Sequence, residues 1–342
     1  MTSRERVLTA LGGRVPDRVP YMEFGIDRSL SRRMLGWPPA AEQKTDLESN
    51  HFSPDEMTQV ADHLGLDNFP YVMRAPVYAE KHAGKDGRLY YGDGMIKSSA
   101  DLAVIDLPDP LDDSIYDGAR EAVANKGERA ACFVTRAGMF PALLGAGIER
   151  FSIALYDDRQ FVESLLDIYF EWSVKVAETV CSMGFDFYVT TDDFAFKSAP
   201  YFSPDVFEEL MLPRYLELAR HVSLPWVMHS DGNVLPFIES LLEIGIAGLH
   251  PLEKGAIDIV FFKQKYGDKV CLLGNVDLNL LAAGTPDEVR EEVRWLLREV
   301  APGGGYILTS GNSLASYCLP ENVQAMTDEV KRSGAYPISV TG

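Results

Sequence analysis

The stretch Pro225-Trp226-Val227-Met228-His229-Ser230-Asp231-Gly232-Asn233 indicates most directly how this chain folds. It begins with mostly apolar residues and runs straight into a histidine, an aspartate and a glycine. A buried parallel strand that delivers polar groups to a cavity at its carboxyl end has this pattern. The same half of the chain repeats the pattern in the runs 187–193, 270–277 and 306–312. Four such runs indicate an enzyme whose reactive groups lie at strand ends.

Working outward from this stretch, apolar runs alternate with helical patterns along most of the chain. The helical patterns lie at 158–183, 204–222, 234–244 and 286–300. The runs that predict strands lie at 19–24, 66–72, 131–135, 187–190, 226–229, 246–250, 270–273 and 306–309. Eight strands that alternate with helices predict an α/β protein with a parallel sheet, which closes into a (β/α)8 TIM-like barrel.

We predict a single domain over residues 1–342, with an N-terminal helical segment, a further helical stretch at 30–62 and a β-rich insertion at 77–117. The alternative fold is an open, doubly wound sheet. That fold would require a glycine-rich phosphate loop after the first strand, and Phe24-Gly25-Ile26-Asp27 is not such a loop.

Composition narrows the class of protein. Hydrophobic residues make up 46% and charged residues 24% of the 342 residues, as in ordinary globular proteins. The formal net charge of −19 argues against a nucleic-acid partner and against an anionic membrane surface. The four cysteines are scattered without a CxxC pair, the first residues are too charged for a signal peptide, and no run approaches the roughly 20 apolar residues of a membrane span. These features predict a cytoplasmic protein.

The carboxyl ends of the strands converge on one cavity in a barrel. Here they supply a mostly acidic set with a few imidazoles: Glu23, Arg136, Asp192, Asp193, His229, Asp231, His250, Asn275, Asp277 and Asn312. Such a set can hold a divalent metal or pair carboxylates for acid–base chemistry. A histidine with carboxylates favours zinc, and without the thiolates of a structural site a catalytic zinc with an open position is the remaining possibility.

The same residues also have structural interpretations. A lone histidine such as His229 is usually a core residue, but the Asp-Gly turn that follows it favours a functional role. Asp192 and Asp193 are adjacent carboxylates whose repulsion raises one pKa or attracts a cation. Glu208 lies in the early turns of a helix, where a carboxylate is favourable for the helix dipole alone.

Several motifs occur together along the chain. They are residues 4–11 with Pro16-Asp17-Arg18-Val19-Pro20, residues 192–200 with Ser203-Pro204, His229-Ser230-Asp231-Gly232-Asn233, Gly274-Asn275-Val276-Asp277, and Ser310-Gly311-Asn312 with Pro320-Glu321-Asn322-Val323. With them the chain resembles the uroporphyrinogen decarboxylase superfamily over nearly its whole length. The resemblance implies a distorted (β/α)8 barrel and is less specific for one reaction.

The true decarboxylases of this superfamily grip a substrate with eight carboxylates through an arginine-rich N-terminal segment. The corresponding stretch here begins Tyr21-Met22-Glu23-Phe24-Gly25-Ile26-Asp27. Its two carboxylates would face like charge, which costs free energy. The superfamily's methyltransferases that act on thiols hold zinc with a His-x-Cys pair and a later cysteine. Those positions resemble His229, Asp231 and Asn312, where the histidine is kept and both sulfurs are absent.

A further branch removes methyl groups from methoxylated aromatics, with zinc held by two acidic residues and a histidine. Asp193, Glu208 and His229 are similar in spacing, with fourteen and then twenty residues between them and Asp in place of the first Glu. This resemblance implies Zn²⁺ on these three residues. It also implies methyl transfer from a small O-methylated donor, a methoxyaromatic compound, to the cobalt of a partner corrinoid protein.

The other candidate residues are expected to act as catalytic or substrate-binding groups in that reaction. Asp192, Asp231 and Asn312 are expected beside the metal or the substrate as catalytic groups. The substrate pocket is expected from Glu23, Arg136, Tyr21, Phe194, Phe196 and Tyr317, of which the aromatic residues are equally well explained as packing at the barrel mouth. Two alternatives stay open: a metal-free carboxy-lyase of porphyrin biosynthesis that uses Asp192 or Asp193, and a non-catalytic member of the family.

Overall fold

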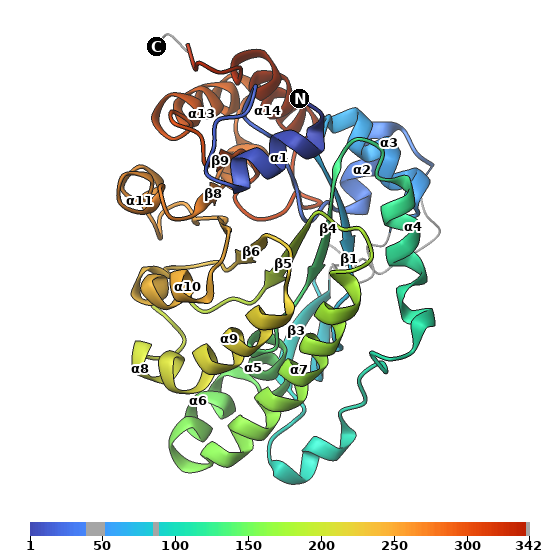
Figure 1. Cartoon of the computed structure of the whole chain (residues 1–342), viewed down its shortest axis with the longest axis vertical. Coiled ribbons are helices and arrows are strands. Elements are labelled where there is room, and N and C mark those ends of the chain that lie inside the picture. The colour runs from blue at the N-terminus through green and yellow to red at the C-terminus, as the bar shows by residue number, and fades with distance from the viewer. Residues whose placement is uncertain (39–51, 85–88, 340–342) are drawn as a thin grey trace.

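Seven parallel strands form the central sheet of the protein (Figure 1). The computed structural model describes residues 1–38, 52–84 and 89–339. In spatial order the strands are β1 (Asn68–Val72), β4 (Ala130–Thr135), β5 (Phe187–Thr191), β6 (Trp226–His229), β7 (Gly248–His250), β8 (Cys271–Leu273) and β9 (Tyr306–Ile307). Each pairs in parallel with the next, and helices follow the strands, so the predicted α/β barrel class is confirmed.

The prediction of an eighth strand at 19–24 is wrong, because this segment is not a regular strand. It has one parallel bridge, between Tyr21 and Leu308. Pro20 has no N–H to donate, which limits a regular ladder here. The segment nevertheless lies at the eighth position, since Met22 N–H donates to the Leu308 carbonyl at 3.1 Å and the Tyr21 carbonyl accepts from Asp67 N–H at 2.8 Å.

Two buried side chains at the start of β1 replace the missing ladder. Asp67 Oδ2 accepts from Tyr21 N–H at 2.9 Å, and Asn68 Oδ1 accepts from Glu23 N–H at 3.2 Å. Asn68 also donates to the Glu23 carbonyl at 2.8 Å. These bonds connect β9 through residues 19–24 to β1, which closes the ring of backbone segments.

The amino ends of the strands are covered by α1 (Ser3–Leu11). A capping box between Thr2 and Glu5 begins this helix. Arg6 reaches from it to the fully buried carboxylate of Asp67 at 2.7 Å. The apolar face of α1 packs into the barrel interior, where Val7, Ala10 and Leu11 join one buried cluster with Val134, Val227 and Ile307 from the strands.

Side-chain alternation along the strands separates this interior from the outer core. Val227 belongs to the interior cluster, whereas its neighbours Trp226 and Met228 belong to the larger cluster between sheet and helices. The same alternation continued past the strand ends places residue 229 on the interior side. It also places residue 193 inside and residue 192 outside, because Phe187 and Val189 point inward.

The helices on the outer face agree with the predicted pattern. The longest, α7 (Arg159–Val180), buries Phe161, Leu165, Tyr169, Trp172 and Val176 at helical spacing. The others around the sheet are α4 (Asp117–Asn125), α5 (Met139–Ala146), α6 (Ile148–Asp157), α10 (Ile238–Ile244), α11 (Ile259–Tyr266), α12 (Leu278–Ala283), α13 (Pro286–Glu299) and α14 (Pro320–Ser333). Of the predicted helical stretch 30–62, the structure shows α2 (Arg28–Leu35) and α3 (Pro54–Leu64), and 39–51 lies outside the described residues.

The helix predicted at 204–222 is interrupted. It consists of α8 (Pro204–Val206), a π-helical turn at Phe207–Met211 and α9 (Leu212–His221). Pro213 lacks the N–H that a continuous α-helix needs at that position, and Leu212 N–H bonds to the Phe207 carbonyl, five residues back. The wider turn matters because it carries Glu208.

The β-rich insertion is confirmed as an antiparallel hairpin of β2 (Ala79–Ala83) and β3 (Leu89–Gly94). The hairpin packs on α5, where Ile96 N–H donates to the Gly145 carbonyl at 2.9 Å (Figure 1). Short 3-10 helices at Ser99–Val104 and Asp113–Tyr116 follow it. Within residues 1–38, 52–84 and 89–339, no helix has both the length and the apolar character to cross a bilayer.

Candidate metal centre

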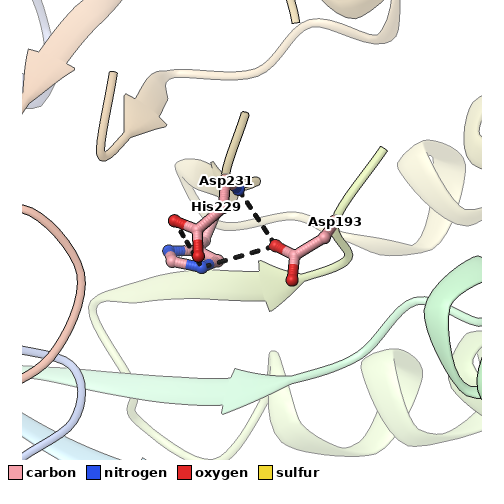
Figure 2. Close-up of side chains that lie close together, drawn as sticks. All are labelled: Asp193, His229 and Asp231. Atoms are coloured by element: carbon pink, nitrogen blue, oxygen red, sulfur yellow. Dashed lines mark hydrogen bonds and ion pairs between the residues drawn. The ribbon is translucent and has the colours of Figure 1, made fainter. Parts of the chain in front are cut away.

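Three side chains converge beyond the carboxyl ends of β5 and β6 (Figure 2). They are His229, the last residue of β6, with Asp193 and Asp231 from the loops after β5 and β6. His229 Nε2 lies 3.6 Å from Asp193 Oδ1 and 3.8 Å from Asp231 Oδ1. One ligand atom from each residue fits within a 4.8 Å span, and in the part of the chain that the structure describes this is the one such group of three or more acidic, His or Cys residues.

The two loops that carry these aspartates are bonded to each other. Asp231 N–H donates to Asp193 Oδ1 at 3.0 Å, and Phe194 N–H donates to the Ser230 hydroxyl at 2.9 Å. Gly232 has φ +81°, and a Cβ there would lie 2.4 Å from the Ala195 carbonyl oxygen, so only glycine allows the loops this close. These contacts hold the two loops together and place the Asp193 carboxylate beside Asp231.

A second imidazole, that of His250, contacts His229 and orients its ring. His229 Nδ1 lies 2.6 Å from His250 Nδ1, and His250 Nε2 lies 3.1 Å from the Thr309 hydroxyl. Phe24 packs edge-on against the His250 ring, with centroids 5.0 Å apart. His229 therefore turns Nδ1 to the barrel interior and Nε2 to the two carboxylates.

The electrostatics of this cluster disfavour the ionised form of Asp231. Burial, followed by the charges of Asp193 and Glu253, raises the pKa of Asp231 to about 8. Asp231 Oδ1 is also buried without a hydrogen-bond partner, which is costly for a carboxylate oxygen. Burial lowers the pKa of His229, with the Asp193 charge opposing and Arg74 adding to the decrease. The site thus presents a neutral imidazole beside two crowded carboxyl groups.

These residues fit a divalent metal. One imidazole and two carboxylates form the three-ligand set of a catalytic zinc site, which leaves a position for a substrate. A cation would relieve the repulsion between the carboxylates and would give the orphaned Asp231 Oδ1 a partner. His250, bonded to the far nitrogen of His229, occupies the place of the outer partner that metal-bound histidines normally have.

Asn312 is brought to the cluster as predicted from the strand ends. Its amide nitrogen donates to Asp231 Oδ2, and its own Oδ1 accepts from the Ser313 hydroxyl at 3.0 Å. Asn312 therefore fixes one oxygen of Asp231 and leaves the other directed at His229.

Glu208 is not brought to the cluster. It is exposed on the π-helical turn, where the neighbouring Phe207 takes the buried position against Phe194. Glu208 was selected because its spacing from Asp193 and His229 resembles the zinc pattern of the demethylating branch. The acidic residue that stands beside Asp193 and His229 is Asp231.

Asp192 and Asp193 point to opposite sides, as strand alternation requires. Asp192 is fully buried and accepts N–H bonds from Ala137 at 2.6 Å, from Phe140 at 2.9 Å and from Gly138 at 3.3 Å. Burial raises the pKa of Asp192 although these three N–H groups and Arg136 oppose the change. The side chain anchors the start of α5 and does not face the metal cluster.

The predicted pocket residues are dispersed. Glu23 is fully buried and accepts from Ser310 N–H at 2.9 Å and from the Ser310 hydroxyl at 2.6 Å. Burial raises the pKa of Glu23 to about 8. Tyr21 is buried beside it, and Arg136 lies over the rings of Tyr91 and Phe140 at 5.8 and 5.6 Å.

Of the three predicted pocket aromatics that remain, one is core and two are exposed. Phe194 is fully buried among Phe207, Tyr215 and Phe237. Phe196 is 52% exposed and packs edge-on against Tyr201 with centroids 4.4 Å apart. Tyr317 is 49% exposed.

Three further residues belong to the site without having been selected from the sequence. Thr309 ends the chain of contacts that starts at His229. Glu253 accepts from Gly232 N–H at 2.8 Å, and Lys197 pairs with it at 3.3 Å. The signal for Thr309 was its place at the end of a predicted strand, and Glu253 follows the strand-end His250 by three residues.

Comparison with known proteins gives consistent results. The methyltransferase from Methanosarcina mazei has the same fold, with a TM-score of 0.73 at 23% identity over 97% of this chain and 99% of that one. The methylated-thiol–coenzyme M methyltransferase of Methanosarcina mazei is 23% identical over 44% of this chain and 40% of its own length. The uroporphyrinogen decarboxylase of Pseudoalteromonas translucida is 34% identical over 79 residues, which span 23% of this chain and 22% of that relative. The uroporphyrinogen decarboxylase (URO-D) family profile matches residues 2–333, and the chain belongs to that family.

Proposed function

We propose that this protein is a zinc-dependent methyltransferase. It moves a methyl group from a small O-methylated donor, a methoxyaromatic compound, to the cobalt of a partner corrinoid protein. Asp193, His229 and Asp231 hold the metal in this proposal. The observation that carries it is the convergence of one imidazole and two carboxylates within 4.8 Å, with one carboxylate oxygen buried and unbonded.

Two observations favour methyl transfer: the names of similar proteins and the ligand atoms of the metal cluster. One relative carries the name of a methyltransferase, and a solved methyltransferase shares the fold. The donor atoms of the cluster are nitrogen and oxygen, and the described cysteines are buried or half-buried elsewhere. Because thiolates are absent from the cluster, an oxygen-linked methyl donor suits it better than the thiolate-rich chemistry of thiol methylation.

When bound, zinc would act as a Lewis acid toward the ether oxygen of the donor and stabilise the charge that develops there. The protein's own residues supply the positioning. Asn312 holds one Asp231 oxygen, and the Asp231 N–H holds Asp193. Phe196, whose carbonyl accepts from Asn233 N–H at 3.0 Å in the loop after β6, presents an exposed ring that suits an aromatic donor.

The environment of the reaction follows from the same proposal. The net charge of −19 disfavours nucleic acid and anionic membranes as partners. The small-molecule donor and the corrinoid protein are the partners that the family resemblance implies. A location in the cytoplasm, where a corrinoid partner would be reached directly, is part of the proposal.

The first experiment is the zinc content of the purified protein after incubation with zinc and removal of the excess. About one zinc per chain is expected. His229→Ala should reduce it to background, and Glu208→Gln is the matched control that should keep it, since Glu208 lies away from the cluster. Retained stoichiometric zinc in His229→Ala would overturn the ligand assignment.

A metal-free carboxy-lyase is the second candidate, because curated relatives of the chain carry the name uroporphyrinogen decarboxylase. It predicts turnover of a polycarboxylated porphyrinogen in the presence of a chelator. Asp193, Asp231 and Glu253 make the site acidic, which disfavours such a polyanion. Decarboxylation that persists without metal would replace the first proposal by this one.

A further inference from the structure

The series of contacts from His229 through His250 ends at the Thr309 hydroxyl, whose hydrogen-bonding role is fixed. The Thr309 hydroxyl lies 2.7 Å from the Ser310 carbonyl oxygen and donates to it. A carbonyl oxygen only accepts, so the single hydroxyl proton of Thr309 is used there. Toward His250, at 3.1 Å, the hydroxyl oxygen is therefore an acceptor.

The Thr309 hydroxyl, as an acceptor, fixes the tautomer of His250. Its Nε2 must carry the proton that is donated to Thr309. The ring is 1% exposed, and the groups beside it are the His229 imidazole, the Thr309 hydroxyl, the Ser310 backbone and the ring of Phe24, none of which carries a negative charge. Neutral His250 with a proton on Nε2 has its lone pair on Nδ1.

The lone pair of His250 in turn fixes His229. The two Nδ1 atoms are 2.6 Å apart, and a hydrogen bond between them requires that one donates and the other accepts. Because His250 Nδ1 accepts, His229 Nδ1 donates. Neutral His229 then has its lone pair on Nε2, the atom that faces Asp193 and Asp231 at 3.6 and 3.8 Å.

We propose that His250 and Thr309 are positioning residues that fix His229 in the Nδ1-protonated tautomer and so direct its Nε2 lone pair at the metal position. Their importance for metal affinity rests on the proposed function. The tautomer itself does not, since the chain of contacts exists in the protein alone.

The tautomer can be measured in metal-free protein labelled with ¹⁵N-histidine. Long-range ¹H–¹⁵N correlation spectra distinguish protonated from unprotonated ring nitrogens, and His229→Ala and His250→Asn assign the signals. We expect protonated Nδ1 and unprotonated Nε2 for His229, with the reverse for His250. The opposite pattern in the wild-type protein would overturn the proposal.

Substitutions of Thr309 test the cause of that pattern. Thr309→Val keeps the shape and removes the acceptor, which frees His250 to move its proton to Nδ1. Thr309→Ser is the matched control that keeps the hydroxyl. We expect Thr309→Val to populate the Nε2-protonated form of His229 and to weaken zinc binding about tenfold in a chelator competition, within the range for outer-sphere substitutions. Thr309→Ser should match the wild-type protein in both readouts.

His250 offers a rescue test of the same relay. His250→Leu removes the acceptor for His229 Nδ1–H and should weaken zinc binding by about 10- to 100-fold. His250→Asn places an amide oxygen near the former Nδ1 and should restore much of the affinity. Wild-type tautomer ratios and zinc affinity in both Thr309→Val and His250→Leu would overturn the proposal. If wild-type protein binds no zinc but shows the expected tautomers, the proposed function fails and the positioning role stands.

Discussion

The backbone N–H of Asp231 donates to Oδ1 of Asp193 at 3.0 Å, across the loops that follow β5 and β6. The same Asp193 oxygen lies 3.6 Å from His229 Nε2. One loop therefore places the carboxylate of the other, and both strands contribute to a single site. Because paired strands β5 and β6 align Thr191 with His229, the two loops start at the same level of the barrel.

Asp231→Asn and Glu208→Gln compare two carboxylates of which only one lies in the cluster. Asp231→Asn should reduce zinc affinity strongly, and Glu208→Gln should leave it unchanged, when both are measured by chelator competition. In metal-free protein at pH 7, Asp231→Asn should also raise the thermal midpoint by a few degrees, because it removes a carboxyl group whose ionisation burial and Asp193 oppose. Equal zinc affinity in the two variants would contradict the assignment of Asp231.

Gly232→Ala tests the close approach of the two loops. A Cβ would meet the Ala195 and Phe196 carbonyl oxygens at 2.4 and 2.5 Å, so the loops must separate. We expect a loss of stability of about 1–3 kcal/mol together with weaker zinc binding. Gly245→Ala is the matched control, since Gly245 has a similar φ of +85° and nothing within 4 Å of the added atom. It should lose some stability and keep zinc, and equal zinc binding by both variants would refute the role of loop contact.

Much of the barrel follows from the sequence because buried parallel strands are apolar runs that end in polar residues. The exception, residues 19–24, has the composition of a strand. Pro20 has no N–H for a regular ladder, and side-chain bonds from Asp67 and Asn68 take the place of the missing backbone bonds. Those partners lie more than forty residues away along the chain. No local pattern in residues 19–24 contains them.

The site is predictable to the extent that it follows strand alternation. Residues 189 and 227 point into the barrel, and counting by two places Asp193 and His229 inside and Asp192 outside. Glu208 was chosen because its spacing resembles the zinc pattern of a family branch, and the structure places it exposed on the π-helical turn. The contact of His250 with Thr309 spans 59 residues and depends on the tertiary fold.

Asp192→Ala and Asp193→Asn should separate stability from metal binding in two adjacent residues. Asp192→Ala leaves three buried N–H groups at the start of α5 without their acceptor, so we expect a loss of roughly 3 kcal/mol or more in urea unfolding. Asp193 is 21% exposed, and its substitution should cost little stability and most of the zinc. A catalytic role for Asp192 would instead appear as a stable, zinc-loaded and inactive Asp192→Asn variant.

Glu23→Gln tests the buried carboxyl group that is bonded to Ser310, through the pH dependence of stability. Burial raises the pKa of Glu23 to about 8 in the folded protein, whereas an unfolded glutamate has a pKa of about 4.3. Between these values the folded state binds one more proton than the unfolded state. This contribution to stability is fully present below pH 4.3 and is lost as the pH rises, by up to about 1.4 kcal/mol per pH unit, until it levels off above pH 8.

The difference in unfolding free energy between Glu23→Gln and wild type should therefore shift in favour of the variant from pH 5 to pH 8 and stay constant above pH 8. Urea unfolding of both proteins at each pH measures it. Glu288→Gln is the matched control, because the Thr285 backbone and hydroxyl bonds lower the pKa of this exposed carboxylate. Because the pKa of Glu288 is lowered in the folded protein, its contribution to stability is fully present above the pKa that it has in the unfolded chain. The difference in unfolding free energy between Glu288→Gln and wild type should therefore be flat from pH 5 to pH 8. A flat difference for Glu23→Gln as well would show that Glu23 is ionised in the folded protein at neutral pH.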